Sequence, residues 1–171
     1  METNVQSNIV IAGASHLTKK PQDTPLNVIE LMCEATQKAA EDAGNDAILS
    51  VVDQIIVPQG TWAISNPGGL VAQHLGIQAK SIIYNIGILQ SSLIKRAIED
   101  VSASKSRCTL IVGGEAKNYE RHASESLNPI PTLSDSRKQE STEFIHPSEL
   151  PISRYEIDTV SYTHLTLPTK A

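Results

Sequence analysis

Two apolar patterns alternate along the first 120 residues, and this alternation limits the folds that the chain can adopt. Short apolar runs, typical of buried β-strands, alternate with segments whose apolar residues recur every three to four positions, as in amphipathic helices. The strand-like runs span 8–14, 51–57, 81–84 and 109–112, and the helical patterns span 28–39, 70–75 and 93–101. This order predicts an α/β fold, with a mainly parallel or mixed sheet and helices on both faces.

Prolines and glycines mark the ends of the predicted helices. Thr24 and Pro25 form a plausible N-cap and first-turn pair for the first helix. Gly44 and Gly76 follow the first two helical patterns, where glycine commonly ends a helix. An irregular loop around Trp62 is predicted between the second strand and the second helix, because prolines and glycines surround it.

The chain divides into three parts. Residues 1–120 form the predicted α/β domain. Residues 121–159 are polar and are predicted to be a loop-rich extension, an incomplete subdomain. The tail 160–171 contains the string VSYTHLTLPT, which resembles a translated sequencing adapter. We therefore expect the tail to be non-native and the natural protein to be longer than this truncated chain.

Composition excludes several classes of function. The net charge is −5 and no stretch is strongly basic, so nucleic acid is not an expected partner. No apolar run approaches the roughly 20 residues of a membrane span. Cys33 and Cys108 are the only cysteines, and both are expected to be buried thiols of a cytoplasmic protein. The histidines show no metal-ligand spacing, so no metal site is expected.

Three segments at strand ends are candidates for chemistry. The first contains Gly13, but a phosphate-binding fingerprint needs three glycines, so a tight strand end is the favoured interpretation. The second, 85–92, has a strand-to-helix turn suited to a nucleophile, yet holds only Ser91 and Ser92, for which helix capping or surface is favoured. The third is Gly113-Gly114-Glu115, either a close backbone approach at a site or a simple turn, with a solvated Glu115 favoured over an acid or base.

Several strings occur in an order typical of one enzyme family. They are TPLNVIELMCEATQKAAEDAG at 24–44, VVDQIIVPQG at 51–60, Asn85, and IVGGEA at 111–116. Together they resemble the N-terminal half of the thiolase superfamily over about residues 8–120. The strings PQGTW, GILQ, VGGEAK and HPSELPISRY are similar to a divergent bacterial branch described as acetyl-CoA acetyltransferase-like.

The resemblance implies an acyl-CoA substrate, a cysteine that becomes acylated, and a homodimer or heteromer built on this half. The position of that cysteine is occupied by Ile88, which has no nucleophilic group. No catalytic residue is therefore expected, and a coenzyme A thioester is expected as substrate without any further cofactor. Candidate substrate-binding residues are Asn85, Gly87, Gln90, Gly113 and Gly114.

The expected function is that of a piece of a thiolase-like acyl-CoA acyltransferase, inactive by itself. Two alternatives stay open. One is a non-catalytic scaffold or partner subunit of the same superfamily. The other is an unrelated nucleotide-binding α/β module.

Overall fold

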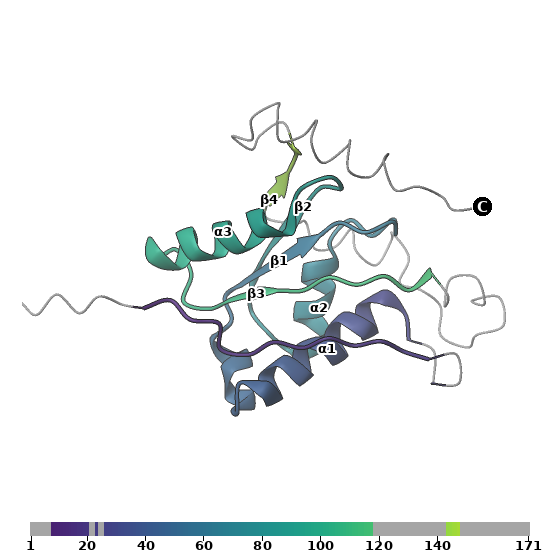
Figure 1. Cartoon of the computed structure of the whole chain (residues 1–171), viewed down its shortest axis with the longest axis horizontal. Helices are drawn as coiled ribbons and strands as arrows, with labels where there is room; N and C mark the ends of the chain where they lie inside the picture. The colour runs from purple at the N-terminus through teal and green to yellow at the C-terminus, as the bar shows by residue number, and fades with distance from the viewer. Residues whose placement is uncertain (1–7, 21–22, 24–25, 118–142, 148–171) are drawn as a thin grey trace, which may run out of the picture.

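The computed structural model describes residues 8–20, 23, 26–117 and 143–147 (Figure 1). Its helices are α1 (Val28–Asp42), the 3-10 helix η1 (Asp46–Val51), α2 (Pro67–Leu75) and α3 (Gln90–Ser102). Its strands are β1 (Gln54–Pro58), β2 (Lys80–Tyr84), β3 (Thr109–Ile111) and β4 (Glu143–Ile145). None of the helices in this described part is long and apolar enough to cross a lipid bilayer.

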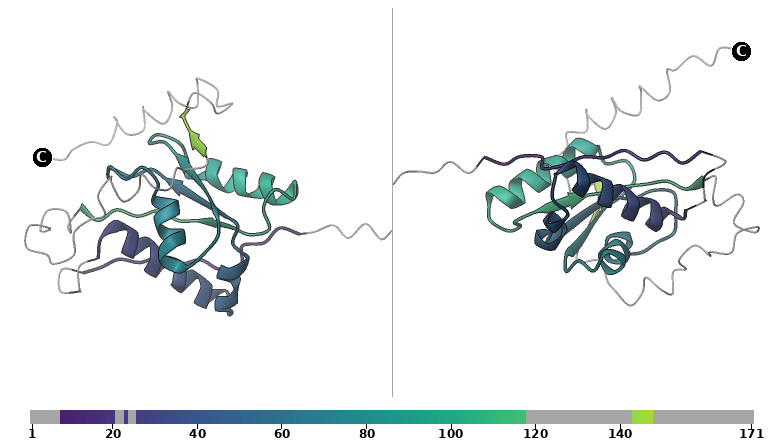
Figure 2. Two further views of the ribbon diagram at one scale, coloured as in Figure 1. Left: turned by 180° about the vertical axis from the view of Figure 1, so that it is seen from behind. Right: turned by 90° about the horizontal axis from the view of Figure 1, so that it is seen from below.

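The strands form one sheet in the order β3-β1-β2-β4, and every pair of neighbours in it is parallel. Residues of β1 alternate between the two faces, as strand geometry requires. Ile55 and Val57 face α1 and α2, whereas Ile56 faces α3. Figures 1 and 2 show the same arrangement, with α3 on one side of the sheet and α1 and α2 on the other. The predicted α/β class, with helices on both faces, is confirmed.

Helix α1 begins later than the sequence indicated. Its N-cap is Asn27, whose side chain accepts hydrogen bonds from the backbone N–H groups of Ile29 and Glu30, both at 3.0 Å. The Glu30 carboxylate in turn accepts the Asn27 backbone N–H at 2.8 Å, which completes a capping box. The expected pair Thr24 and Pro25 lies outside the described residues. The C-terminal end agrees with prediction, because Gly44 follows the helix with φ +75°.

The predicted first strand at 8–14 is wrong. The described residues of this segment form no strand, and Val10 and Ile11 are 74% and 83% exposed. The chain lies along α1 instead, as both views in Figure 2 show. The Ala14 N–H donates to the Asp42 carboxylate at 2.9 Å, and the Ser15 hydroxyl donates to the Ala35 carbonyl at 2.6 Å. An apolar run becomes a strand only where its backbone can hydrogen-bond to a neighbouring strand. Here the segment forms hydrogen bonds to a helix instead.

Strand β4 lies within the extension that was predicted to be loop-rich. It pairs with β2, so that Ile82 lies opposite Glu143 and Tyr84 lies opposite Ile145. Ile145 is 8% exposed and joins the apolar cluster beneath α3. Sequence periodicity does not indicate this strand, because three residues are too few to show a period.

A polar network joins α3 to the sheet through Arg96. Its Nε donates to the Asp100 carboxylate at 2.6 Å, and Gln54 of β1 donates to the same oxygen at 3.0 Å. Burial raises the pKa of Asp100, but the hydrogen bonds from Arg96 and Gln54 outweigh it and hold the pKa below its ordinary value. The remaining Arg96 nitrogens reach β4, where Nη1 and Nη2 donate to the two oxygens of Glu143 at 3.0 and 2.9 Å.

Candidate functional site

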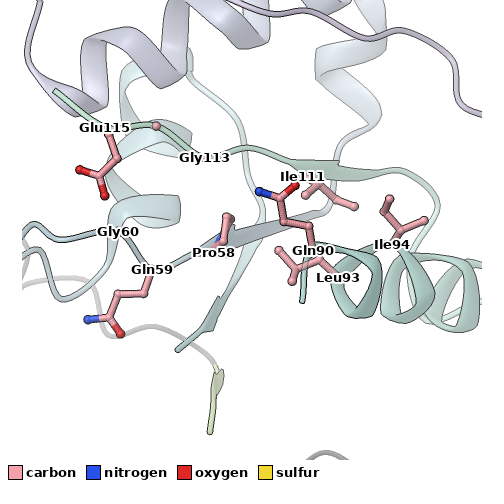
Figure 3. Close-up of a pocket in the computed structure, with 10 residues that line it drawn as sticks. Pro58, Gln59, Gly60, Gln90, Leu93, Ile94, Ile111, Gly113 and Glu115 are labelled. Carbon is pink, nitrogen blue, oxygen red and sulfur yellow. The ribbon is translucent and has the colours of Figure 1, made fainter. Parts of the chain in front are cut away.

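An open groove of about 500 Å³ lies at the carboxyl ends of β1 and β3, beside the first turns of α3 (Figure 3). In open parallel sheets this edge is where ligands commonly bind. One end of the groove is apolar and the other is polar, as the side chains in Figure 3 show. Its walls are formed by Pro58, Gln59, Gly60, Gln90, Leu93, Ile94, Ile111, Gly113, Gly114 and Glu115.

The polar end is held together by Glu115. Its carboxylate accepts the backbone N–H of Thr61 at 2.7 Å and the Thr61 hydroxyl at 3.0 Å. A side chain at Gly60 would bring its Cβ to 2.5 Å from this carboxylate, so glycine is needed there. Trp62 adds a second link, because its indole N–H donates to the Gly114 carbonyl at 3.0 Å. Glu115 therefore fastens the loop after β1 to the segment after β3, and it remains exposed, as expected.

The two glycines after β3 have different roles. A Cβ on Gly113 would lie 2.8 Å from the ring of Pro58, so this position allows the close approach of β1. A Cβ on Gly114 would meet only ordinary contacts, the nearest at 3.5 Å from Met32. The side-chain carbonyl oxygen of Gln59 is closed to solvent and has no hydrogen-bond partner among the described residues.

The strand-to-helix turn lies outside the groove lining. The Ile88 N–H donates to the Asn85 carbonyl at 3.4 Å, and Gly87 has φ +97°, as residue three of a type II turn requires. Ile88 packs against the apolar cluster beneath α3. Of the predicted site residues, the structure thus brings Gln90, Gly113 and Gly114 into one groove. It leaves Asn85 and Gly87 outside that lining.

Asn85 has a partner that the sequence analysis did not foresee. Its side-chain oxygen accepts the Ile86 backbone N–H at 2.7 Å, which directs its NH₂ group toward His146. The Nδ2 of Asn85 lies 3.2 Å from Nδ1 of His146, so this ring nitrogen is the acceptor. The two residues are 61 positions apart, and only the register of β4 on β2 brings them together. No local pattern could have indicated the pair.

The groove-lining residues that the sequence analysis missed include Gln59, Leu93, Ile94 and Ile111. Gln59 directly follows a parallel strand, and that position was an available signal. The sequence analysis assigned the three apolar residues, Leu93, Ile94 and Ile111, only to patterns that face the core. Yet Ile94 and Ile111 are 47% and 38% exposed, so they present apolar surface to the groove.

The remaining candidates offer no reactive group. Burial raises the pKa of the Cys33 thiol to about 11, and the nearby Glu30 charge adds to this effect. Burial also raises the pKa of Cys108, so neither thiol is an activated nucleophile. α3 begins after Leu89, so neither Ser91 nor Ser92 is its N-cap. Within the described residues, no cluster of His, Cys, Asp or Glu side chains could hold a metal ion.

Gly13 does not form a phosphate-binding loop. It follows no strand, and a Cβ there would clash with the Ala39 carbonyl oxygen of α1. Close packing of the N-terminal segment on α1 accounts for this glycine. The chain matches no protein-family model, no curated protein and no solved structure.

Proposed function

We propose that this chain is a thiolase-like protein that binds acyl-CoA without forming a covalent intermediate at position 88. One observation carries the proposal, namely the groove at the carboxyl ends of β1 and β3. Its apolar wall of Leu93, Ile94 and Ile111 suits an acyl chain. The amide side chain of Gln90 suits the amide groups of a pantetheine arm.

The environment of Ile88 supports the non-covalent part of the proposal. An aliphatic side chain has no electron pair to attack a thioester. Ile88 also packs against the apolar cluster that contains Leu93, so it has a packing role in place of a chemical one. Any acyl transfer would need a nucleophile other than residue 88.

A second candidate function is that of a non-catalytic partner subunit. Ile94 and Ile98 lie one turn apart on α3 and are 47% and 46% exposed. Adjacent exposed isoleucines on one helix favour contact with another protein. This candidate predicts co-purification with a related subunit that has a cysteine at the equivalent turn.

Isothermal titration of the full chain with CoA, acetyl-CoA and a longer acyl-CoA tests the first candidate. We expect binding, with higher affinity for the longer acyl chain because of the apolar wall. Gln90→Ala should weaken binding about three- to tenfold, since one hydrogen bond is lost. Gln73→Ala is the matched control, because Gln73 is exposed on α2, outside the groove.

One result would refute the proposal, namely the absence of heat change with all three ligands at millimolar concentration.

A further inference from the structure

Strand β4 is held on β2 by a short set of backbone contacts. Its three residues pair in register with β2, Ile82 with Glu143, Ile83 with Phe144, and Tyr84 with Ile145. The ladder continues one step further, since the Asn85 backbone N–H donates to the Ile145 carbonyl at 3.0 Å. Among the described strands, β4 pairs with β2 alone. Figure 1 shows it at the end of the sheet, beyond β2.

Side chains make this docking selective for one sequence. Glu143 accepts two hydrogen bonds from the Arg96 guanidinium, and the Lys80 ammonium lies 3.6 Å from the same carboxylate. Ile145 is buried to 8% exposure in the apolar cluster that contains Tyr84. Nδ1 of His146 accepts a hydrogen bond from the Asn85 side-chain amide. The edge of β2 therefore recognises an extended segment with an acidic residue, an aliphatic residue two positions later, and then histidine.

These contacts do not depend on which chain supplies the segment. Every one is made by the four residues 143–146 and the β2–α3 surface. The 25 residues 118–142 separate the segment from Lys117. An extended chain of that length spans up to roughly 80 Å, more than the distance to an adjacent molecule of this size. A connection of this length is therefore long enough for a neighbouring copy to place its own segment in the same site.

We propose that the β2 edge is a strand-exchange site, which binds Glu143–His146 of a second copy of this chain. Two copies can donate their segments to each other, so the contact closes as a symmetric pair. Parallel pairing and the Arg96–Glu143 ion pair are the same in the exchanged form. The exchange involves no ligand in the groove, so it is independent of acyl-CoA binding.

Mixing two differently tagged full-length chains tests the proposal. One carries Ile83→Cys and the other carries Phe144→Cys, at positions that lie opposite each other in the ladder. Paired strands bring these Cα atoms to about 4.8 Å, within the range of a disulfide. Under mild oxidation we expect a disulfide-linked dimer with both tags, at about tenfold or more the yield of a control mixture, because pairing raises the effective thiol concentration.

In the control mixture, Val10→Cys replaces Phe144→Cys, since Val10 is 74% exposed and lies outside the sheet. Cys33 and Cys108 are kept in all chains, so both mixtures share any background from them. Adding Glu143→Gln to the Phe144→Cys chain should lower the yield about tenfold, because the charge on the carboxylate is lost. A chain with both Ile83→Cys and Phe144→Cys should form the bond within itself.

Three outcomes would overturn the proposal. If the two-cysteine chain closes internally and the mixture yields no more dimer than its control, the segment does not exchange. If the two-cysteine chain does not close either, β4 does not pair with β2 as required. If Glu143→Gln leaves the yield unchanged, Arg96 does not select the segment.

Discussion

The bidentate pair between Arg96 and Glu143 should stabilise the fold, and a double-mutant cycle can measure by how much. The two N–H···O distances are 3.0 and 2.9 Å, and the side chains are 23% and 32% exposed. A charge-assisted hydrogen bond contributes about 1.5–3 kcal/mol. The two bonds share one pair of charges, and solvent screens Glu143 in part. We therefore expect a coupling free energy of about 2 kcal/mol between Arg96→Met and Glu143→Gln.

Arg96→Met alone should lower the free energy of unfolding more than Glu143→Gln alone. It removes the pair and also leaves Asp100, which is 2% exposed, with Gln54 and the more distant Lys105 ammonium, at 3.9 Å, as its side-chain partners in the described part of the chain. Breaking a buried ion pair from one side typically costs about 3–5 kcal/mol, so about 3 kcal/mol is expected for this partly buried one. Urea unfolding at pH 7, followed by far-UV circular dichroism, gives the four free energies of the cycle.

Lys95 and Glu99 provide the matched control on the same helix. Their charged atoms lie 3.8 Å apart, and their side chains are 70% and 58% exposed. Exposed pairs of this spacing contribute about 0.3–0.5 kcal/mol. A coupling free energy for Arg96 and Glu143 no larger than that of the control pair would refute the reasoning, because it would mean that burial and bidentate geometry add nothing.

Four further predictions concern pH, packing and thiol reactivity. The hydrogen bonds from Arg96 lower the pKa of Glu143 from 4.5, so the contribution of this carboxylate to stability is complete above pH 4.5 and is lost as the pH falls through the lowered pKa. When the pH is decreased below about 4.5, the melting temperature should therefore decrease, and it should decrease less steeply in Glu143→Gln than in wild type. Ser81→Ala should be neutral or stabilise by up to about 1 kcal/mol in a thermal melt, since the buried hydroxyl has no partner among the described residues; a loss of stability would contradict this. Gly13→Ala should destabilise by about 1–3 kcal/mol and speed proteolysis within residues 8–20, because its Cβ would meet the Ala39 carbonyl; unchanged cleavage would count against that contact. Cys33 should react with a disulfide reagent at pH 8 far more slowly in the native chain than in urea, given its pKa of about 11, and equal rates would contradict its burial.

The helices and strands between residues 54 and 111 could be predicted because their apolar spacing and their terminal residues agree with the way they pack in the fold. In α2, for instance, the apolar spacing and Gly76 both indicate the same helix, and Gly76 has φ +67°. The segment 8–14 shows the limit of that approach. Its composition is that of a strand, but a strand also needs a neighbouring strand with which to pair. Sequence periodicity does not show whether such a partner strand is available.

The candidate site could be predicted only in part for a similar reason. Gln90, Gly113 and Gly114 follow strands, so their position at the carboxyl edge was foreseeable. The pairing of Asn85 with His146 and of Arg96 with Glu143 depends on β4, a three-residue strand. Contacts across such long separations are set by register, and no local propensity encodes register.

The exposed N-terminal segment has a consequence for handling of the protein. Ile9, Val10 and Ile11 are consecutive β-branched residues, uncharged and 40%, 74% and 83% exposed. Short segments with this composition stack readily into cross-β assemblies when nothing in the native fold covers them. Gly13 allows the chain to lie close to α1, and Ala14 and Ser15 hydrogen-bond to that helix, without covering these side chains. The contacts that order the segment thus leave a template for aggregation on the surface of an otherwise well-packed α/β unit.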